Sequence, residues 1–152
     1  LFLLEPSLVT DPPEDGERAS EAVDAVADAV DADVVVHTYW GAFDETTHAH
    51  LLDADIDAVG YDLIHGRDRN LEVIAEYGST DDVALGLVDG QNTEVESAET
   101  IRERVEWFEE SLPGPVDFDR AYLTPNTELF YLPTSVFEAK LDALGAATEG
   151  SQ

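Results

Sequence analysis

The sequence contains no cysteine and few basic residues. The absence of cysteine excludes disulfides, thiolate zinc sites and a cysteine nucleophile. Only 7 Lys and Arg stand against 35 Asp and Glu, and Lys140 is the only lysine. There is therefore no basic patch to neutralise phosphates, and we expect no nucleic-acid partner. No apolar run approaches the ~20 residues that a membrane helix needs, so we expect no membrane partner either.

The acidic residues give a formal charge of -28. Three interpretations of this charge compete. A salt-adapted (halophilic) protein is favoured, because the acidic residues are spread along the whole chain and molar salt shortens the Debye length to about 3 Å. An acidic surface that mimics nucleic acid is the second. Cation buffering is the third, but it usually needs denser acidic blocks or a calcium-binding loop, and the sequence has neither.

Length and composition predict one globular domain over residues 1–152. A hydrophobic content of 43% is ordinary for a folded protein, and the chain is long enough for a sizeable core. Leu1 opens directly on an apolar run, without an initiator methionine or a signal-peptide pattern. We therefore expect a processed or truncated piece of a soluble, cytoplasmic protein.

Apolar runs alternate with helical patterns along the chain. The strands expected from these runs are 1–4, 34–36, 58–63, 83–88 and 121–123. The first expected helix begins near 13–18, the second covers 45–52, and the third covers 70–77 with Gly78 at the C′ position. A fourth helix follows a Ser97 cap. The last helix begins at a capping box of Ser135 and Glu138 and ends near Gly145. Pro113-Gly114-Pro115 is expected to stop the fourth helix, and residues 150–152 are expected to fray.

Strict alternation of this kind predicts an α/β fold with a parallel sheet and right-handed crossovers. Five βα units are too few to close an eight-stranded barrel. Either the sheet is open, or the chain is the later, C-terminal portion of a TIM (β/α)8 barrel whose earlier strands lie elsewhere. Both alternatives place the carboxyl ends of the strands on one rim, where ligands bind in such folds.

Polar groups follow each predicted strand, so candidate site residues can be named before any motif. The stretch His37-Thr38-Tyr39-Trp40-Gly41 could stack a flat ligand on Trp40, or form a core aromatic pair with a turn glycine. Asp62 could ligate a metal or hold an amine, and Arg67 could hold a carboxylate. The alternative for these two is a local ion pair or a helix cap.

The later strand ends are equally ambiguous. Asp89 and Asn92 could bond an aminopyrimidine-like edge or form an Asx turn, and Asn126 reads as a short polar tip or a turn residue. His48 and His50 are two residues apart in a predicted helix, so they do not share a face and no zinc site is expected there. No phosphate loop, dinucleotide fingerprint or Ser–His–Asp arrangement can be read.

Several of these strand ends, taken in order, resemble segments of the cobalamin-independent methionine synthase family. Leu4-Glu5-Pro6-Ser7-Leu8 resembles its Asp-Glu-Pro-Ala-Leu, and Thr38-Tyr39-Trp40-Gly41 is similar to its Thr-Tyr-Phe-Gly. The segment from Gly60 to Gly66 resembles Gly-Leu-Asp-Leu-Val-Arg-Gly, and that from Gly86 to Asn92 resembles Gly-Val-Val-Asp-Gly-Arg-Asn. Pro125-Asn126-Thr127-Glu128-Leu129 is similar to Pro-Ser-Cys-Ser-Leu.

The resemblance implies a barrel of the N-terminal, zinc-free type. The family has two related barrels, and the C-terminal one carries a zinc held by two Cys, a His and a Glu. Here His37 keeps the histidine position, Tyr39 and Thr127 stand where the thiolates would be, and Asp62 stands where the Glu would be. Leu4 replaces an acid that helps to hold the amine of homocysteine. The resemblance thus implies no metal on this chain, with His37 and Asp62 as the only fallback ligands.

The family reaction moves a methyl group from a methylated polyglutamyl tetrahydrofolate to homocysteine. The resemblance implies that this chain contributes folate or substrate binding, or a scaffold for a zinc-bearing partner barrel or a homo-oligomer. Trp40 would stack the pterin, Asp89 and Asn92 would bond its edge, and Arg67 would hold a carboxylate; Glu5 and Asn126 complete the candidate set. The alternatives are a structural or regulatory pseudoenzyme, and a self-sufficient methyltransferase that uses His37 and Asp62 as catalytic groups with another metal.

Overall fold

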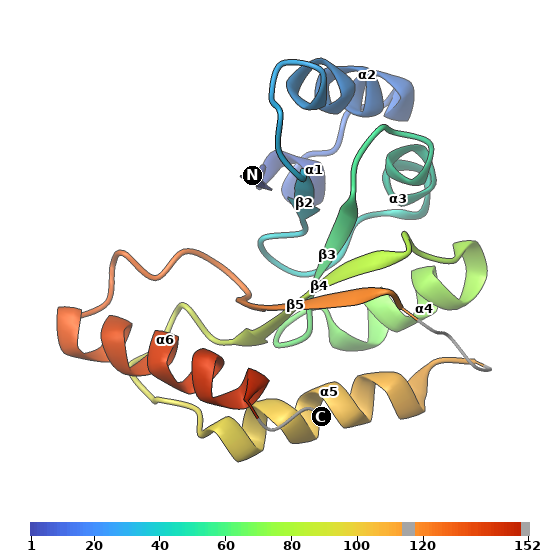
Figure 1. The fold of residues 1–152 in the computed structure, drawn as a ribbon. Coiled ribbons are helices and arrows are strands. Elements are labelled where there is room, and N and C mark those ends of the chain that lie inside the picture. The colour runs from blue at the N-terminus through green and yellow to red at the C-terminus, as the bar shows by residue number, and fades with distance from the viewer. Residues whose placement is uncertain (114–117, 150–152) are drawn as a thin grey trace.

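The computed structural model describes residues 1–113 and 118–149 (Figure 1). Strands and helices alternate, as the sequence predicted. The elements are β1 (Phe2–Leu4), α1 (Ser7–Thr10), α2 (Gly16–Ala27), β2 (Val35–His37), α3 (Glu45–Leu52), β3 (Ala58–Asp62), α4 (Arg67–Tyr77), β4 (Asp82–Val88), α5 (Ala98–Ser111), β5 (Arg120–Pro125) and α6 (Thr134–Thr148).

The five strands form one parallel sheet in the order β1-β2-β3-β4-β5. Sequential order with parallel pairing requires a crossover helix after each strand and brings all the carboxyl ends to one rim. The predicted α/β fold with a parallel sheet is therefore confirmed.

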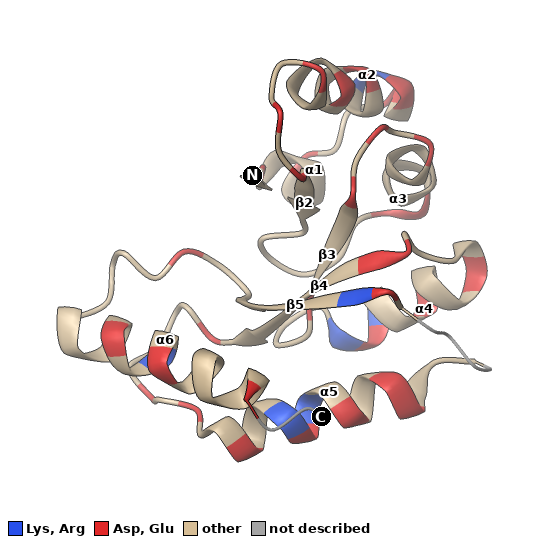
Figure 2. Cartoon of the chain, viewed as in Figure 1, with Lys and Arg blue, Asp and Glu red and all other residues tan. Residues whose placement is uncertain are grey.

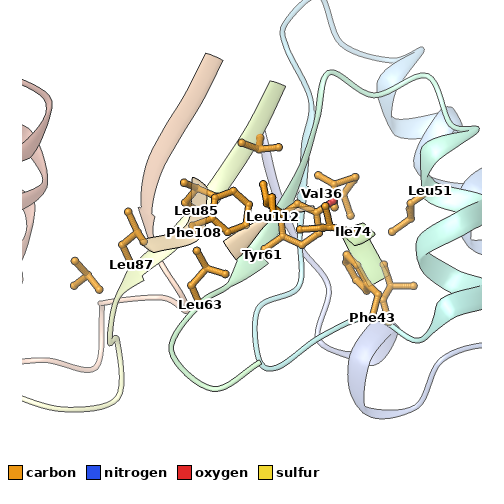
Figure 3. Close-up of a cluster of buried hydrophobic side chains, with 14 of the residues drawn as sticks. Val36, Phe43, Leu51, Tyr61, Leu63, Ile74, Leu85, Leu87, Phe108 and Leu112 are labelled. Carbon is orange, nitrogen blue, oxygen red and sulfur yellow. The ribbon is translucent and has the colours of Figure 1, made fainter. Parts of the chain in front are cut away.

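The two faces of the sheet carry different side chains, because the side-chain period of a strand is two. Large residues such as Val59, Leu85 and Leu87 pack with Leu51 and Phe108 of the helices into the main core (Figure 3). The opposite face carries a smaller cluster, which consists of Val35, Ala58 and Ala84 with Tyr122 packed against them. The helices therefore cover one face, and the other is the concave side that a barrel would turn inward.

Most helix boundaries follow from capping chemistry. The carboxylates of Asp15 and Asp44 and the hydroxyl of Ser97 accept backbone N–H groups of the first turns of α2, α3 and α5. Gly78 ends α4 with a φ of 82°, which suits glycine. Helix α4 begins at Arg67, earlier than the predicted start at residue 70, and Gly66 is its N-cap.

The predicted last helix is present, but both of its predicted ends were wrong. Ser135 and Glu138 form no capping box, because Pro133 precedes the first turn and its fixed φ already suits a helix start. The helix also continues through Gly145 to Thr148, since a glycine inside a helix weakens it without breaking it. The α5 helix ends at Ser111, but 114–117 of the predicted stop and the predicted frayed end 150–152 lie outside the described residues.

Candidate functional site at the carboxyl ends of the strands

His37 lies on the concave face of the sheet in a slot made by two glycines. A Cβ at Gly60 would lie 2.3 Å from Cδ2 of the imidazole, and one at Gly86 would lie 3.1 Å from Cε1. The ring therefore rests directly against the backbones of β3 and β4, and only 1% of the residue is exposed. Any side chain at Gly60 would displace the imidazole.

Hydrogen bonds occupy both ring nitrogens of His37. Nδ1 accepts the backbone N–H of Tyr39 at 3.1 Å, so the proton of the neutral ring resides on Nε2. Nε2 lies 3.3 Å from the Thr124 hydroxyl, which itself donates to the carbonyl of Leu85 at 3.1 Å. Burial lowers the pKa of His37 from 6.5 to about 4, so the ring is neutral at pH 7.

Asp62 ties three loop segments together. Its Oδ2 accepts the N–H of Gly41 at 2.9 Å, and its Oδ1 accepts those of Ile64 at 2.8 Å and His65 at 3.0 Å. The side chain is fully buried. The carboxylate thus serves as a cap for the turn that enters α4, which was the alternative considered for this motif.

Asn126 makes an equivalent connection from the end of β5. It is fully buried, and its Oδ1 accepts the N–H of Gly90 at 2.9 Å while its Nδ2 lies 3.0 Å from Nδ1 of His65. The sequence indicated a turn or a polar tip here. The structure shows a side chain that joins the loops after β3, β4 and β5.

Asp89 and Asn92 lie in the loop after β4 and bond to each other. The Asp89 carboxylate accepts the N–H of Gln91 at 2.8 Å and the Asn92 amide at 2.5 Å, which is Asx-turn geometry. The N–H of Asp89 in turn donates to Glu96 at 2.9 Å. Their contacts in the structure are thus turn contacts, and their role toward a pterin stays a prediction.

Lys140 fixes this loop from α6. Its side chain is fully buried, and its ammonium donates to the carboxylate of Glu96 at 2.8 Å and to the carbonyl of Glu94. Burial raises the pKa of Glu96, but the Asp89 N–H and the Lys140 ammonium outweigh it and lower that pKa overall. Sequence reasoning noted that Lys140 was the only lysine but assigned it no role. A single lysine in so acidic a chain was the available signal.

Trp40 is accessible on this rim. It is 40% exposed and makes an edge contact with Tyr39, with ring centroids 5.3 Å apart. Tyr39 has a φ of 66°, which is unusual for a residue other than glycine. Burial, followed by the neighbouring Glu128 carboxylate, raises the pKa of Tyr39 to about 12.

Arg67 and Glu5 both contact other groups of the protein. The Arg67 guanidinium lies over the Trp107 ring of α5, 3.3 Å from its centroid, as a cation–π pair. The Glu5 carboxylate accepts the N–H of Ser7 at 3.0 Å and so caps the short helix α1, and that side-chain contact lowers the pKa of Glu5. Neither contact points to a ligand, and their binding roles stay predictions.

A cavity of about 640 Å³ lies beside the rim, between β1, β5 and α6. His37 is the only predicted site residue among the described residues that line it. Thr124, Thr127 and Glu128 add polar groups at its rim end, and sequence reasoning weighed only Thr127 among them. The remaining lining is mostly apolar. No sequence signal marked this cavity, because it depends on the curvature of the sheet.

The residues present do not fit the zinc ion that the family resemblance places in the C-terminal barrel. A ligating imidazole needs a free lone pair, and the nitrogens of His37 are engaged as acceptor and donor. The Asp62 oxygens already accept three backbone N–H groups. Within 1–113 and 118–149, no three His, Asp or Glu side chains are grouped so that they could hold a metal.

Comparison with known proteins decides the family. A sequence model described as "Cobalamin-independent synthase, Catalytic domain" matches residues 10–149. The chain belongs to the cobalamin-independent methionine synthase family. The resemblance drawn from the strand-end motifs is thereby confirmed. The finer prediction, that the chain is of the N-terminal, zinc-free type, stays a prediction, and the matching model is the one described as the catalytic domain.

Two relatives carry the name 5-methyltetrahydropteroyltriglutamate–homocysteine methyltransferase. The protein of Salinibacter ruber is 32% identical over 136 residues, which are 87% of this chain and 17% of the relative. That of Halalkalibacterium halodurans is 31% identical over 129 residues, or 83% of this chain and 16% of the relative. The part of these relatives that this chain matches is therefore about a sixth of their length.

A solved structure supports the fold. The B12-independent methionine synthase of Shewanella sp. W3-18-1, in complex with selenomethionine, superposes with a TM-score of 0.75 and 19% identity. The match covers 97% of this chain and 47% of that chain. This confirms that the five βα units correspond to part of a barrel of the methionine synthase family. No described helix is long and apolar enough to span a membrane.

Proposed function

We propose that this chain is a zinc-free portion of a methionine synthase barrel, which binds the folate methyl donor or acts as a scaffold for a zinc-bearing barrel. The observation that carries the proposal is the full hydrogen bonding of His37, with Nδ1 accepting from Tyr39 and Nε2 donating to Thr124. A ring held in this way stabilises the rim and offers no lone pair to a metal.

The proposed reaction is methyl transfer from a methylated polyglutamyl tetrahydrofolate to homocysteine, the activity named for the relatives. This chain would supply a binding surface, and activation of the homocysteine thiol would fall to the partner barrel. Trp40 is the ligand contact that we favour, because its aromatic ring is accessible on the rim and can stack on a pterin. Asp89 would offer the acceptor capacity that its turn bonds leave, and Asn92 would offer its second amide N–H.

We further infer that the protein works in a salt-rich cytoplasm. Asp and Glu are distributed over all the longer helices rather than on one face (Figure 2). A charge of -28 on a single domain repels itself at low ionic strength, and molar potassium chloride screens that repulsion. We expect thermal stability to increase as the potassium chloride concentration rises, as a melting series would show.

Tryptophan fluorescence tests the binding role. The chain has two tryptophans, and Trp107 is covered by the Arg67 guanidinium while Trp40 is accessible. We expect 5-methyltetrahydropteroyltriglutamate to quench the fluorescence saturably in high potassium chloride. The quenching should disappear in Trp40→Phe and persist in Trp107→Phe.

The contrary outcome is equally informative. If the wild-type protein is folded by circular dichroism and shows no saturable quenching, folate binding at this rim is refuted and the scaffold role remains. If Trp107→Phe loses the signal and Trp40→Phe keeps it, the ligand lies on the α5 side, and Arg67 becomes the contact to examine.

A further inference from the structure

His65 is a half-exposed histidine of the rim, in contrast to the buried His37. It lies on the turn between β3 and α4, and 50% of its side chain is accessible. Its Nδ1 lies 3.0 Å from the amide nitrogen of Asn126 and 3.6 Å from Oδ2 of Asp62. Both partners are fully buried. Because Nδ1 points at buried groups, the far edge of the imidazole, which carries Nε2, points out of the rim.

The hydrogen bonds of Asn126 determine which nitrogen of His65 carries the proton. The N–H of Gly90 donates to Oδ1 of Asn126 at 2.9 Å, so the other end of the amide, Nδ2, is the donor toward His65. In the neutral ring, Nδ1 accepts from this amide and the proton is on Nε2. In the protonated ring, both nitrogens carry protons. Nε2 is therefore a donor in either charge state.

This outward nitrogen is available to a ligand. Within residues 1–113 and 118–149, the polar contacts of the His65 ring all go through Nδ1. A donor that buried groups hold in one direction is preorganised for an acceptor, because the side chain has already lost its rotational freedom.

The Trp40 ring originates beside the His65 ring. Oδ2 of Asp62, which lies 3.6 Å from Nδ1 of His65, also accepts the N–H of Gly41 at 2.9 Å. A Cβ on Gly66 would overlap the carbonyl group of Gly41. Gly41 follows Trp40 and Gly66 follows His65, so the backbones just after the two side chains pack directly on each other.

Helix α4 fixes the relative position of these two segments. Asn70 is fully buried, and its amide donates to the carbonyl of Gly41 at 3.0 Å and to that of Asp62 at 2.8 Å. The accessible face of Trp40 and the outward N–H of His65 thus belong to one fixed unit of the rim.

The charge around His65 decides which acceptor fits. The Asp62 carboxylate lies behind the ring, and the chain carries 35 acidic residues against 7 basic ones. A carboxylate or phosphate brought to Nε2 would be repelled by this negative field, whereas a carbonyl oxygen or a ring nitrogen would not. The site therefore favours an uncharged acceptor.

We propose that His65 is a further ligand-binding residue of this rim, and that its Nε2–H donates to a carbonyl oxygen or ring nitrogen on the edge of the flat ring that stacks on Trp40. For the folate of the proposed function, that ring is the pterin. The inference rests on the proposed binding at Trp40 and adds the orientation of the ring, whose acceptor edge faces the turn before α4. A ring with a donor at this edge binds less well, because two N–H groups would then face each other.

Paired amide substitutions test the contact. The side-chain nitrogen of glutamine can take the place of Nε2, whereas the shorter asparagine reaches only the place of Nδ1. Quenching of Trp40 in a Trp107→Phe background, in molar potassium chloride, gives the dissociation constant of 5-methyltetrahydropteroyltriglutamate. We expect His65→Ala and His65→Asn to raise this constant about fivefold, as the loss of one neutral hydrogen bond implies, and His65→Gln to keep it within about twofold. His50→Ala, which removes a histidine of α3 that contacts Gly16, should leave it unchanged.

The 15N NMR spectrum of the His65 ring tests the orientation of the ligand. Without ligand, we expect the neutral ring to carry its proton on Nε2. A tetrahydropterin that lacks the aminobenzoyl-glutamate tail should shift the Nε2 signal when it is added at millimolar concentration. A shift that only the triglutamate causes would place the contact on the tail and overturn the proposal.

Three further results would overturn it. One is a neutral His65 ring with its proton on Nδ1. Another is equal affinity of wild type and His65→Ala, both folded by circular dichroism, which refutes the His65 contact and leaves binding at Trp40 intact. The third is His65→Gln that binds as weakly as His65→Asn. A folded wild type without saturable quenching is a different outcome, because it refutes the proposed folate binding and this inference together.

Discussion

The rim at the carboxyl ends of the strands and the groove beside β5 (the cavity between β1, β5 and α6) differ in how many of their side chains and backbone groups find partners within the described chain. On the rim, the side chains of His37, Asp62 and Asn126 bond to backbone or side-chain groups of neighbouring loops. In the groove, apolar side chains such as Phe2 and Leu141 are exposed and a sheet edge is unpaired. The polar region that invites a ligand hypothesis is largely self-sufficient, and the apolar region is incomplete.

This difference separates two sources of functional signal. Polar residues at strand ends are also what a barrel needs to hold its loops, because each buried N–H must find an acceptor. An uncovered apolar stripe has no such internal explanation. In this chain the evidence for a small ligand on the rim therefore rests mainly on Trp40.

Lys140 connects the two regions, and its removal should have the largest effect. Lys140→Ala removes a fully buried side chain, leaves Glu96 with only its longer contact to Arg104 at 3.6 Å, and frees the loop that carries Asp89. We expect a loss of about 4 kcal/mol in the free energy of unfolding, measured by urea denaturation in high salt. Arg69→Ala, which breaks an exposed pair with Glu45, should have a far smaller effect. Equal losses in the two variants would show that the buried Lys140–Glu96 pair stabilises the fold no more than an exposed ion pair does.

Acidification should weaken the fold through buried imidazoles outside the groove. His48 is buried with Nε2 3.1 Å from the Tyr61 hydroxyl, and burial lowers its pKa from 6.5 to about 4. The unfolded chain binds the proton first, so the stability from this group is complete above pH 6.5 and is lost as the pH falls toward 4. The expected contribution is about 3 kcal/mol, seen as the difference in pH profile between wild type and His48→Gln. Superimposable profiles would refute the buried neutral state.

Asp62→Asn probes the rim alone. The amide oxygen can still accept the N–H groups of Ile64 and His65, but the amide nitrogen then faces the N–H of Gly41. We expect a cost of about 2 kcal/mol in unfolding free energy, with no change in zinc content. A variant of unchanged stability that loses bound zinc would restore Asp62 as a metal ligand.

Leu141→Glu should have the smallest effect on the isolated chain. The side chain is 44% exposed, and exposed substitutions change stability by roughly 0.5 kcal/mol or less. A large loss of stability in the isolated chain would mean that Leu141 belongs to the core.

The strand and helix order could be predicted from the sequence because the signals are local. Apolar β-branched runs such as 34–36 and caps such as Ser97 act within a few residues. The error at Ser135 arose because two start signals competed, and Pro133 began the helix first. Family membership was also readable, since the strand-end motifs occur in order along the chain.

The contacts of the site could not be predicted, because they join residues distant in sequence. The His37–Thr124 contact spans 87 residues, and that between Asn126 and His65 spans 61. The stacking of Arg67 on Trp107 likewise depends on how α4 and α5 pack. The groove depends on sheet curvature and on which edges remain open, and neither leaves a local signature.

The most direct test of the central claim is the 15N NMR spectrum of the His37 ring, recorded with and without one equivalent of zinc. We predict a neutral ring with the proton on Nε2, as the bonds to Tyr39 and Thr124 require, and no change on addition of the metal. A stoichiometric shift of either ring nitrogen with zinc would contradict the account and make this rim a metal site.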